Sequence, residues 1–415
     1  MRSCGDGRDG RLRRQIGLDG ALGDDAGGLR GAFSGDGGRA LRPGDAWLEN
    51  LLPQAGGALE AAGPLSGGGW RSSGSGRADG GAVGTAGGAG ADFRPDLGLG
   101  PGFDAPVGPG GYVWWYIDAF SDDGRHGLTI IAFVGSVFSP YYAWRGRRAP
   151  EDHCAINVAL YGERARWAMT ERGAGALARS RENFAVGSSA LRWDGQGLDI
   201  DIVEVCAPWP HRLVGRVRLD VETFNARVFE LEPVGRHLWR PIAPLARVSV
   251  TMSHPALQWR GHGYFDTNRG DEPLEAGFRG WSWSRARVRE GARVFYESEN
   301  RRGGQTALSL LFAENGALVE RLAPDLVRLP QTRWRLPRST RSENPAHVIA
   351  TLEDAPFYAR SNIAHRIDGE DAVSVHESLD LDRFANPVVK AMLPFRMPRV
   401  TGRPQKRTPS EIFTV

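Results

Sequence analysis

From residue 112 onward, short runs rich in Val, Ile, Tyr, Trp and Phe recur between turns of Gly, Pro, Asn and Asp. β-branched and aromatic residues favour strands, and such runs between turn residues are typical of sandwiches and barrels. The runs predict strands over residues 112–120, 127–134, 155–161, 198–205, 213–221, 247–253, 293–297, 308–312, 348–352 and 373–379. Turns at 122–127 and 194–197 predict two hairpins. A helical apolar period occurs only weakly, at 174–181 and 380–393.

The predicted fold class is therefore all-β. Some 300 folded residues exceed one eight-stranded barrel, so we expect two β-barrel halves in tandem. Pro and Gly cluster at 233–244, which places the boundary between a first β domain, 109–240, and a second, 241–400. Residues 401–415 are expected to form a flexible tail.

The first hundred residues have a different composition, because they hold 29 of the 56 glycines and few β-branched or aromatic residues. Such a segment buries too little apolar surface to offset the entropy of ordering the chain. We therefore predict a disordered, Gly-rich extension over residues 1–108.

Charge and cysteine content narrow the class of protein. The net charge of +3 is small for 415 residues, which argues against a nucleic-acid binder. Cys4, Cys154 and Cys206 stand far apart, so neither a metal site nor a disulfide framework is expected. No stretch reaches the ~18–20 apolar residues of a membrane-spanning helix. Nucleotide-binding and hydrolase motifs are absent from the sequence. The sequence does not indicate an oligomeric state.

The segment QWRGHGYFDTN at 258–268 carries the most informative polar pattern. Side chains alternate faces along a strand, so His262, Tyr264, Asp266 and Asn268 would share one face. Glycines at 261 and 263 on the other face suggest a bulge or the close approach of another group. The polar face is either a solvated outer surface or a patch at the floor of a cavity.

Other candidates lie on neighbouring segments. In GRHLWRP at 235–241, His237 and Trp239 would share a strand face and complete an acid–aromatic site. Trp281 and Trp283 share a face in GWSWSR and would either pack in the core or line an apolar cavity that holds substrate. Asp118, beside the hairpin turn at 122–127, is expected to be solvated.

Four motifs in order resemble the carotenoid 1,2-hydratases, or hydroxyneurosporene synthases, of purple photosynthetic bacteria. They are FSPYYAWRGR at 138–147, CAINVALYG at 154–162, RWAMTER at 166–172 and GHGYFDTN at 261–268. The resemblance covers residues 110–397. It implies two lipocalin-like (calycin) halves, in agreement with the all-β prediction.

The resemblance also implies an activity. It is the cofactor-independent addition of water to the terminal C1–C2 double bond of acyclic carotenoids such as neurosporene and lycopene, on the route to spheroidene or spirilloxanthin. No cofactor or metal is implied. The partners would be the carotenoid, water and, peripherally, a membrane, since carotenoids reside in bilayers. A cytoplasmic protein at the photosynthetic membrane is expected, with residues 141–148 as a segment that could touch anionic headgroups.

The resemblance points to His237, Trp239, Tyr264 and Asp266 as the catalytic residues, and chemistry suggests their roles. Hydration of an isolated alkene begins with a strong proton donor, and a buried carboxylic acid is a natural one. We expect Asp266 to protonate C2. Trp239 and Tyr264 would stabilise the tertiary cation at C1 through cation–π contacts. His237 would orient or deprotonate the attacking water.

Two rival functions share the predicted fold. A non-catalytic, lipocalin-like carrier of carotenoid or lipid would have the cavity without a need for the acid and histidine. A glycoside-active β protein would need two carboxylates converging on one cleft, and the sequence offers no strong second carboxylate.

Overall fold

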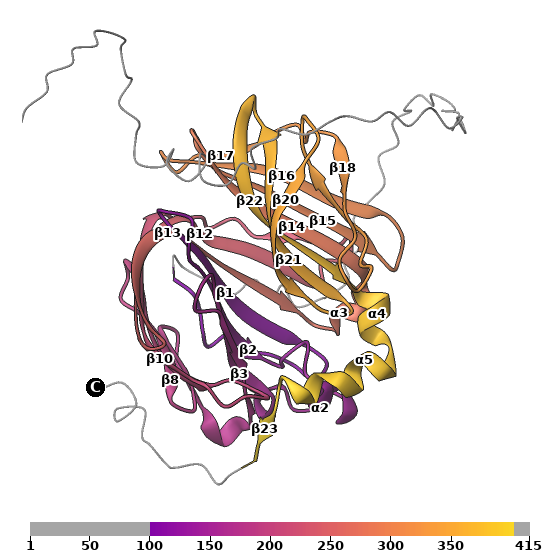
Figure 1. Ribbon diagram of the computed structural model, residues 1–415. Helices are drawn as coiled ribbons and strands as arrows, with labels where there is room; N and C mark the ends of the chain where they lie inside the picture. The colour runs from indigo at the N-terminus through magenta and orange to yellow at the C-terminus, as the bar shows by residue number, and fades with distance from the viewer. Residues whose placement is uncertain (1–99, 402–415) are drawn as a thin grey trace, which may run out of the picture. The chain divides into compact units, whose positions relative to one another are not determined.

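The computed structural model describes residues 100–401, and these residues form antiparallel β-sheets with a few short helices (Figure 1). The strands of the first half are β1 (Tyr112–Ser121), β2 (Gly127–Val134), β3 (Cys154–Tyr161), β4 (Arg166–Met169), β5 (Glu171–Arg172), β6 (Leu177–Arg179), β7 (Asn183–Val186), β8 (Ser189–Trp193), β9 (Gly197–Val205), β10 (Arg212–Thr223), β11 (Phe229–Glu230), β12 (His237–His254) and β13 (Ala256–Gly270).

The later strands are β14 (Phe278–Val288), β15 (Gly291–Asn300), β16 (Gln305–Ala313), β17 (Leu318–Glu320), β18 (Leu326–Leu329), β19 (Arg338–Arg341), β20 (His347–Asp354), β21 (Tyr358–Ile367), β22 (Glu370–Asp380) and β23 (Arg399–Val400). The helices are α2 (Pro140–Trp144), α3 (Leu274–Gly277), α4 (Leu381–Ala385) and α5 (Pro387–Met392), with 3-10 turns η1 (Pro150–Asp152), η2 (Ala174–Ala176) and η3 (Leu393–Phe395). All ten predicted strands are present.

Two large sheets organise these strands. The first sheet has fourteen strands, in the order β23-β5-β3-β2-β1-β13-β12-β10-β9-β8-β7-β6, with β11 on β12 and β4 on β3. The second has seven, in the order β17-β16-β15-β14-β22-β21-β20. Both predicted hairpins form, between β1 and β2 and between β8 and β9. The predicted all-β fold class is confirmed, because antiparallel strands in two large sheets make up most of the described residues.

The predicted domain boundary at 240/241 falls inside β12. The first sheet continues through β13 to Gly270, and the second begins at Phe278, so the chain changes sheets at 271–277. The prolines that suggested a linker, Pro241 and Pro244, instead lie where the pairing of β12 with β13 shifts register. Proline lacks a backbone N–H, so it fits such an irregular stretch of strand.

Most of the predicted N-terminal extension and of the tail, residues 1–99 and 402–415, lies outside the described residues. Residues 100–108 are described, and they are part of the core. Phe103 is fully buried, with its ring 5.0 Å from Trp115 and 5.8 Å from Phe184. The folded part therefore begins before the predicted limit of residue 108, because one aromatic side chain anchors this segment.

The helix predictions had different outcomes. Residues 380–393 form α4 and α5, which meet at Asn386; its side chain accepts from the Val388 N–H at 2.9 Å and begins α5. The helix predicted at 174–181 is wrong, because η2 is a single 3-10 turn and Leu177–Arg179 pair with β7. Gly173 and Gly175 weaken a helix there, and cross-strand pairing decides the outcome.

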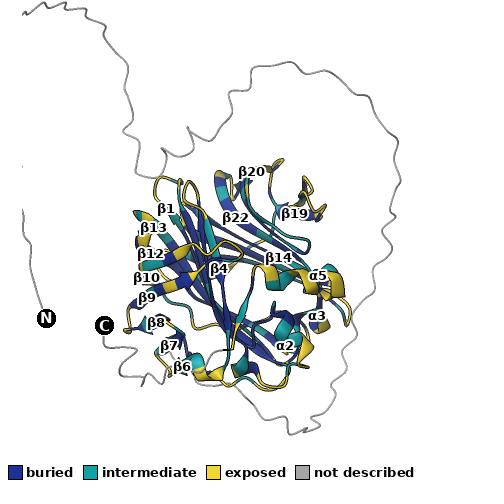
Figure 2. Cartoon of the chain, turned by 60° about the horizontal axis from the view of Figure 1, so that its bottom comes forward, coloured by how far each residue is buried: buried dark blue, intermediate teal, exposed yellow. Residues whose placement is uncertain are grey.

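Strand β1 is buried on both faces, and this positions the site (Figure 2). Val113, Trp115 and Ile117 point into the core that the first sheet encloses. The alternate residues Tyr112, Trp114 and Tyr116 belong to a second, aromatic core that includes side chains of the second sheet. A strand with two apolar faces is typical of a fully buried position between two layers.

Candidate active site

The candidate site lies on the face of the first sheet that packs against the second sheet. Because side chains alternate along a strand, Tyr264, Asp266 and Asn268 of β13 share this face, as predicted. Antiparallel pairing brings Tyr116 of β1 opposite Asp266, and Trp239 of β12 opposite Asn268. The polar face is thus buried between two sheets instead of facing solvent.

Asp266 is the centre of this arrangement. Its side chain is 4% exposed, and its Oδ2 atom accepts two hydrogen bonds, from Trp239 Nε1 at 2.8 Å and from the Tyr264 hydroxyl at 2.8 Å. The other oxygen, Oδ1, is buried and has no hydrogen-bond partner. Three of the four predicted catalytic residues therefore contact one another directly, and one carboxyl oxygen remains available.

Burial raises the pKa of Asp266 to about 7, because the charged form loses its hydration. The hydrogen bonds from Trp239 and Tyr264 act in the opposite direction, and the negative charges of Glu377 and Asp118 add to the increase. Burial also raises the pKa of Tyr264 well above its usual range, so its hydroxyl remains a donor. A substantial fraction of Asp266 is consequently protonated at neutral pH.

Aromatic rings from both sheets surround Asp266. The Tyr264 ring lies 5.3 Å from that of Trp283, and the Trp239 ring lies 5.2 Å from that of Tyr296, which is 6.1 Å from Trp281. Trp283 is buried and Trp281 partly buried, so both predicted tryptophans belong to the aromatic core beside the site. Such faces attract a cation, by ~2 kcal/mol or more when desolvated.

His237 shares the strand face of Trp239, as predicted, but lies apart from Asp266. It pairs with Gly270, four residues along β13 from Asp266, a distance of about 13 Å along an extended strand. Its Nδ1 is 2.8 Å from the Tyr112 hydroxyl, and its Nε2 is 3.4 Å from Glu272 Oε1. Burial lowers the pKa of His237, although Glu272 opposes this effect, so the ring is neutral at neutral pH.

Two glycines make room for the His237 ring. A Cβ atom on Gly277 would lie 2.3 Å from His237 Nε2, and one on Gly270 would lie 2.6 Å from Nδ1. Glu272 also binds Arg302, by two bonds of 2.7 and 2.6 Å, and Arg236 at 3.0 Å. His237 thus belongs to a packed network where the chain passes from the first sheet to the second.

His262, at the other end of the predicted face, is partly exposed. Its ring lies within 3.1 Å of Arg247, which pairs with Asp122. Gly261, on the opposite face, explains the predicted close approach, since a Cβ atom there would lie 1.8 Å from the carbonyl oxygen of Phe120.

Buried ion pairs link the two sheets beside the site. The sequence analysis did not predict these ion pairs. Asp118 was expected to be solvated, yet it is fully buried. It binds Arg285 Nη2 at 2.5 Å and Arg360 Nη2, which come from β14 and β21 of the second sheet. Arg360 also binds Glu377 of β22 and the Tyr116 hydroxyl. The partners of Asp118 stand 167 and 242 residues away, so no local pattern could reveal them.

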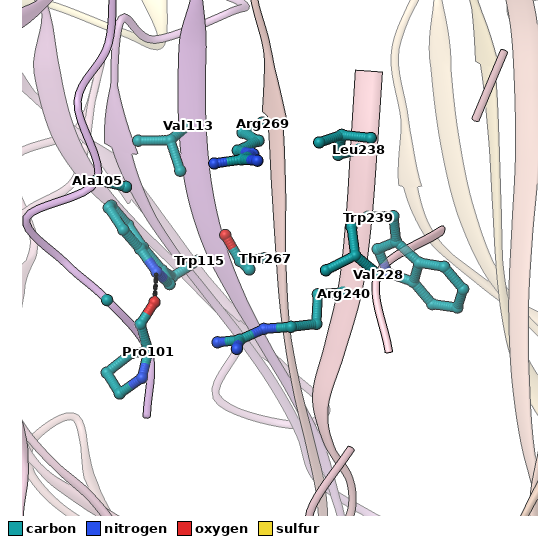
Figure 3. A pocket seen from close by; sticks show the side chains of 11 residues that line it. Pro101, Ala105, Val113, Trp115, Val228, Leu238, Trp239, Arg240, Thr267 and Arg269 are labelled. Carbon is teal, nitrogen blue, oxygen red and sulfur yellow. Dashed lines mark hydrogen bonds between the residues drawn. The ribbon is translucent and has the colours of Figure 1, made fainter. Parts of the chain in front are cut away.

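A separate pocket lies on the opposite face of β12 and β13 (Figure 3). Arg240, Arg269 and Trp115 line it, and so does Trp239, whose indole points away from the Arg240 guanidinium. Asp266 does not line this pocket. Instead, aromatic side chains fill the space around Asp266, so a bulky ligand would have to displace them.

Within residues 100–401, no group of three or more His, Cys, Asp and Glu is arranged to hold a metal ion. Over the same residues, none of the helices has both the length and the apolar character that crossing a bilayer requires.

The family model for the carotenoid hydratase CrtC matches residues 130–406. The chain belongs to the carotenoid hydratase family. The chain is 53% identical to the acyclic carotenoid 1,2-hydratase of Thiocapsa roseopersicina, over 91% of this chain and 94% of that protein. It is 49% identical to the acyclic carotenoid 1,2-hydratase of Rubrivivax gelatinosus, over 96% of this chain and 100% of that protein. Membership of this family makes the protein an enzyme and confirms the predicted resemblance.

Among solved structures, kievitone hydratase from Nectria haematococca is similar over 69% of this chain and 95% of its own, with 10% identity and a TM-score of 0.45.

The motif GHGYFDTN, which carries Tyr264 and Asp266, lies within the matched carotenoid hydratase region, as do His237 and Trp239.

The raised pKa of Asp266 predicts how stability depends on pH in this carotenoid hydratase. Between the ordinary pKa of 3.8 and about 7, the folded chain keeps a proton that the unfolded chain releases. Stability therefore falls as pH rises through this window, by on the order of a few kcal/mol. Asp266→Asn removes this titration, so its free energy of unfolding, measured by urea denaturation, should fall less between about pH 5 and pH 8.

Asp122→Asn is the matched control. Its hydrogen bond with Arg247 lowers the pKa of Asp122, so this carboxyl titrates below the window and the variant should keep the wild-type slope. Equal slopes for wild type and Asp266→Asn would contradict a protonated Asp266.

Proposed function

We propose that the protein hydrates the terminal C1–C2 double bond of acyclic carotenoids such as neurosporene and lycopene, with Asp266 as the proton donor. The observation that carries this proposal is the buried carboxyl with one unpartnered oxygen among aromatic rings. The names of the two relatives support the substrate class. A reaction that uses only a proton and water needs no cofactor.

The proposed reaction proceeds in two steps. Asp266 carries its proton on Oδ1, because Oδ2 accepts from Trp239 and Tyr264. The proton moves to C2, and the C1–C2 π electrons form the new C–H bond and leave a tertiary cation at C1. Water then bonds to C1 through oxygen and loses a proton to a base, which gives the 1-hydroxy carotenoid. The proton returns to Asp266 and completes the cycle.

The surroundings suit both steps. Trp239 and Tyr264 present electron-rich faces that stabilise the cation by ~2 kcal/mol or more each when desolvated. Trp281 and Trp283 offer apolar surface for the hydrocarbon chain, which makes them the proposed substrate-binding residues. Since these rings fill the space around Asp266, they change rotamers when the carotenoid enters.

Two groups are proposed for the base that takes the proton from water. His237 is the acceptor suggested by the sequence, and it lies about 13 Å along the strand from Asp266. Glu377 lies nearer to Asp266. It stands opposite Trp283 in the pairing of β22 with β14, and it accepts a hydrogen bond from Tyr116, which stands opposite Asp266 in the pairing of β1 with β13. Its side chain is 14% exposed, so water can reach it. We favour Glu377.

We also propose that the enzyme works in the cytoplasm at the surface of the membrane that holds its substrate, because a long hydrocarbon dissolves in bilayers and not in water. A non-catalytic carotenoid carrier is the alternative function. It is disfavoured by membership of an enzyme family, and conversion of lycopene by the purified protein, seen as a mass gain of one water, decides between the two.

Asp266→Asn should abolish hydration while the protein stays folded, because the amide fits the same space and cannot donate a strong acid proton. In the wild type, kcat/KM should fall as pH rises above about 7, where Asp266 loses its proton. Turnover is measured by chromatography of the 1-hydroxy product, and folding by circular dichroism. Near-normal turnover by Asp266→Asn would exclude Asp266 as the acid.

Hydration in heavy water should place one deuterium on carbon, at C2. Protonation at C2 makes a carbon–deuterium bond that does not exchange afterwards, whereas the deuterium of the new hydroxyl washes out. Mass spectrometry and NMR of the product locate it, with a reaction in ordinary water as the control. A product without carbon-bound deuterium rules out the protonation-first route.

Glu377→Gln should lower kcat by about 10²–10⁴ if Glu377 accepts the proton, since general-base catalysis contributes that much. His237→Gln should then lower the free energy of unfolding, because it disturbs the contacts with Tyr112 and Glu272, while kcat stays close to the wild-type value. Kinetics and urea denaturation of both variants test this assignment. The reverse pattern, with kcat lost only in His237→Gln, assigns the role to His237.

A further inference from the structure

An apolar and basic surface lies at the end of the protein where α2, α3 and α5 meet (Figure 2). Glu275 of α3 links its parts, because it binds both Arg147, which follows α2, and Lys390 of α5, the latter at 2.9 Å. We call it the helical surface and define it by the exposed residues Trp144, Arg145, Arg148, Val388, Met392, Phe395 and Arg396.

The apolar side chains of the helical surface are unusually large and exposed. Trp144 is 58% exposed, Val388 69% and Phe395 74%. Apart from Lys390, the segment 387–395 is uncharged, and Val389 and Leu393 on its inner side pack on the aromatic core. Apolar side chains on both the inner and the outer side are typical of a helical segment that is covered on both sides. Some apolar partner therefore fits the outer side.

Charge identifies the kind of partner. Residues 140–148 contain three arginines, and residues 386–401 contain one lysine and two arginines, and neither segment contains Asp or Glu. Three of these cations are paired with acids, Arg147 and Lys390 with Glu275 and Arg399 with Glu171. The exposed cations of the helical surface are Arg145, Arg148 and Arg396. Clustered cations beside exposed aromatic and aliphatic side chains fit an anionic lipid surface, where each cation contributes ~1 kcal/mol.

Aromatic side chains connect the helical surface to the candidate site. Beneath α5, the Lys390 ammonium lies 5.1 Å from the Phe384 ring, which is 5.0 Å from Phe357 and 5.7 Å from Phe138. Phe138 is followed by Phe133 at 6.4 Å and by Trp114 at a further 6.2 Å.

The row ends at the active site. Trp114 lies 6.2 Å from Trp281, and Trp281 lies 6.1 Å from Tyr296, the neighbour of Trp239. A continuous row of rings is a path along which a hydrocarbon can slide without meeting an unpaired polar group.

We infer that the helical surface docks on an anionic bilayer and that the carotenoid passes from the bilayer to Asp266 along this row of rings. The inference rests on the proposed function for the identity of the passing molecule. It replaces the predicted segment 141–148 with a larger surface, in which Tyr142 is buried and Trp144 is the residue of α2 that faces outward.

The test compares two double variants of the full chain. Val388→Glu with Phe395→Glu changes the helical surface, and Trp209→Glu with Leu322→Glu changes large apolar residues elsewhere that are at least as exposed. Binding is measured by sedimentation with vesicles made of phosphatidylglycerol and phosphatidylcholine in equal parts. The first variant should bind at least about tenfold more weakly than wild type, and the second should bind as wild type. Wild-type binding should weaken with salt.

Activity gives the second readout. The helical-surface variant should lose hydration of carotenoid embedded in vesicles and lose far less with detergent-dispersed carotenoid. Asp266→Asn should bind vesicles normally without hydrating, so failure of the chemistry and failure of docking are distinguished. Wild-type protein that ignores anionic vesicles, or a helical-surface variant that binds them normally, overturns the inference. The inference is also overturned if the wild-type protein is a dimer and the helical-surface variant is a monomer, because the surface would then be a self-association site.

Discussion

The burial of one carboxyl group between two sheets governs the rest of this structure. Two acids, Asp118 and Asp266, lie close together on the same sheet face, and they have different hydrogen-bond partners. Asp118 is held by the guanidinium groups of Arg285 and Arg360, whereas Asp266 receives only the neutral donors Trp239 and Tyr264. Neutral donors stabilise a buried carboxylate less than cations do, so desolvation prevails at Asp266. The interface thus holds an ion pair that joins the sheets and, beside it, an acid that keeps its proton.

Strand periodicity was sufficient to place the polar face of β13, because alternation is a local property of the chain. It correctly grouped Tyr264, Asp266 and Asn268, and it placed Trp239 on one strand face with His237. It failed where register and long-range pairing decide. His237 shares the face of Trp239, yet pairing with Gly270 carries it away from Asp266. The ion pairs of Asp118 depend on two strands far along the chain, and Pro241 marks a register shift where composition suggested a domain boundary.

The junction between the sheets gives His237 a physical context. Residues 271–277 connect the sheets, and Glu272 in this segment binds Arg236 just before β12 and Arg302 just after β15. The hydrogen bond from Arg302 lowers the pKa of Glu272 to about 2, so the carboxylate stays charged and keeps both cations. His237 packs against this carboxylate and against Gly277. This small network therefore joins the start of β12 and the end of β15 to the segment that connects the two sheets.

A closed aromatic interface and an insoluble substrate impose opposite requirements. Close packing excludes water and keeps Asp266 protonated, but it leaves no room for a hydrocarbon. Aromatic rings suit both requirements better than aliphatic side chains do. A ring that turns about χ1 and χ2 exchanges one aromatic contact for another with a small loss of packing energy. The apolar chain that enters replaces the contacts it displaces and excludes water as the rings did. Under the proposed mechanism, occupation of the site preserves the desolvation that raises the pKa of Asp266, so that binding and proton donation would rest on the same apolar surroundings.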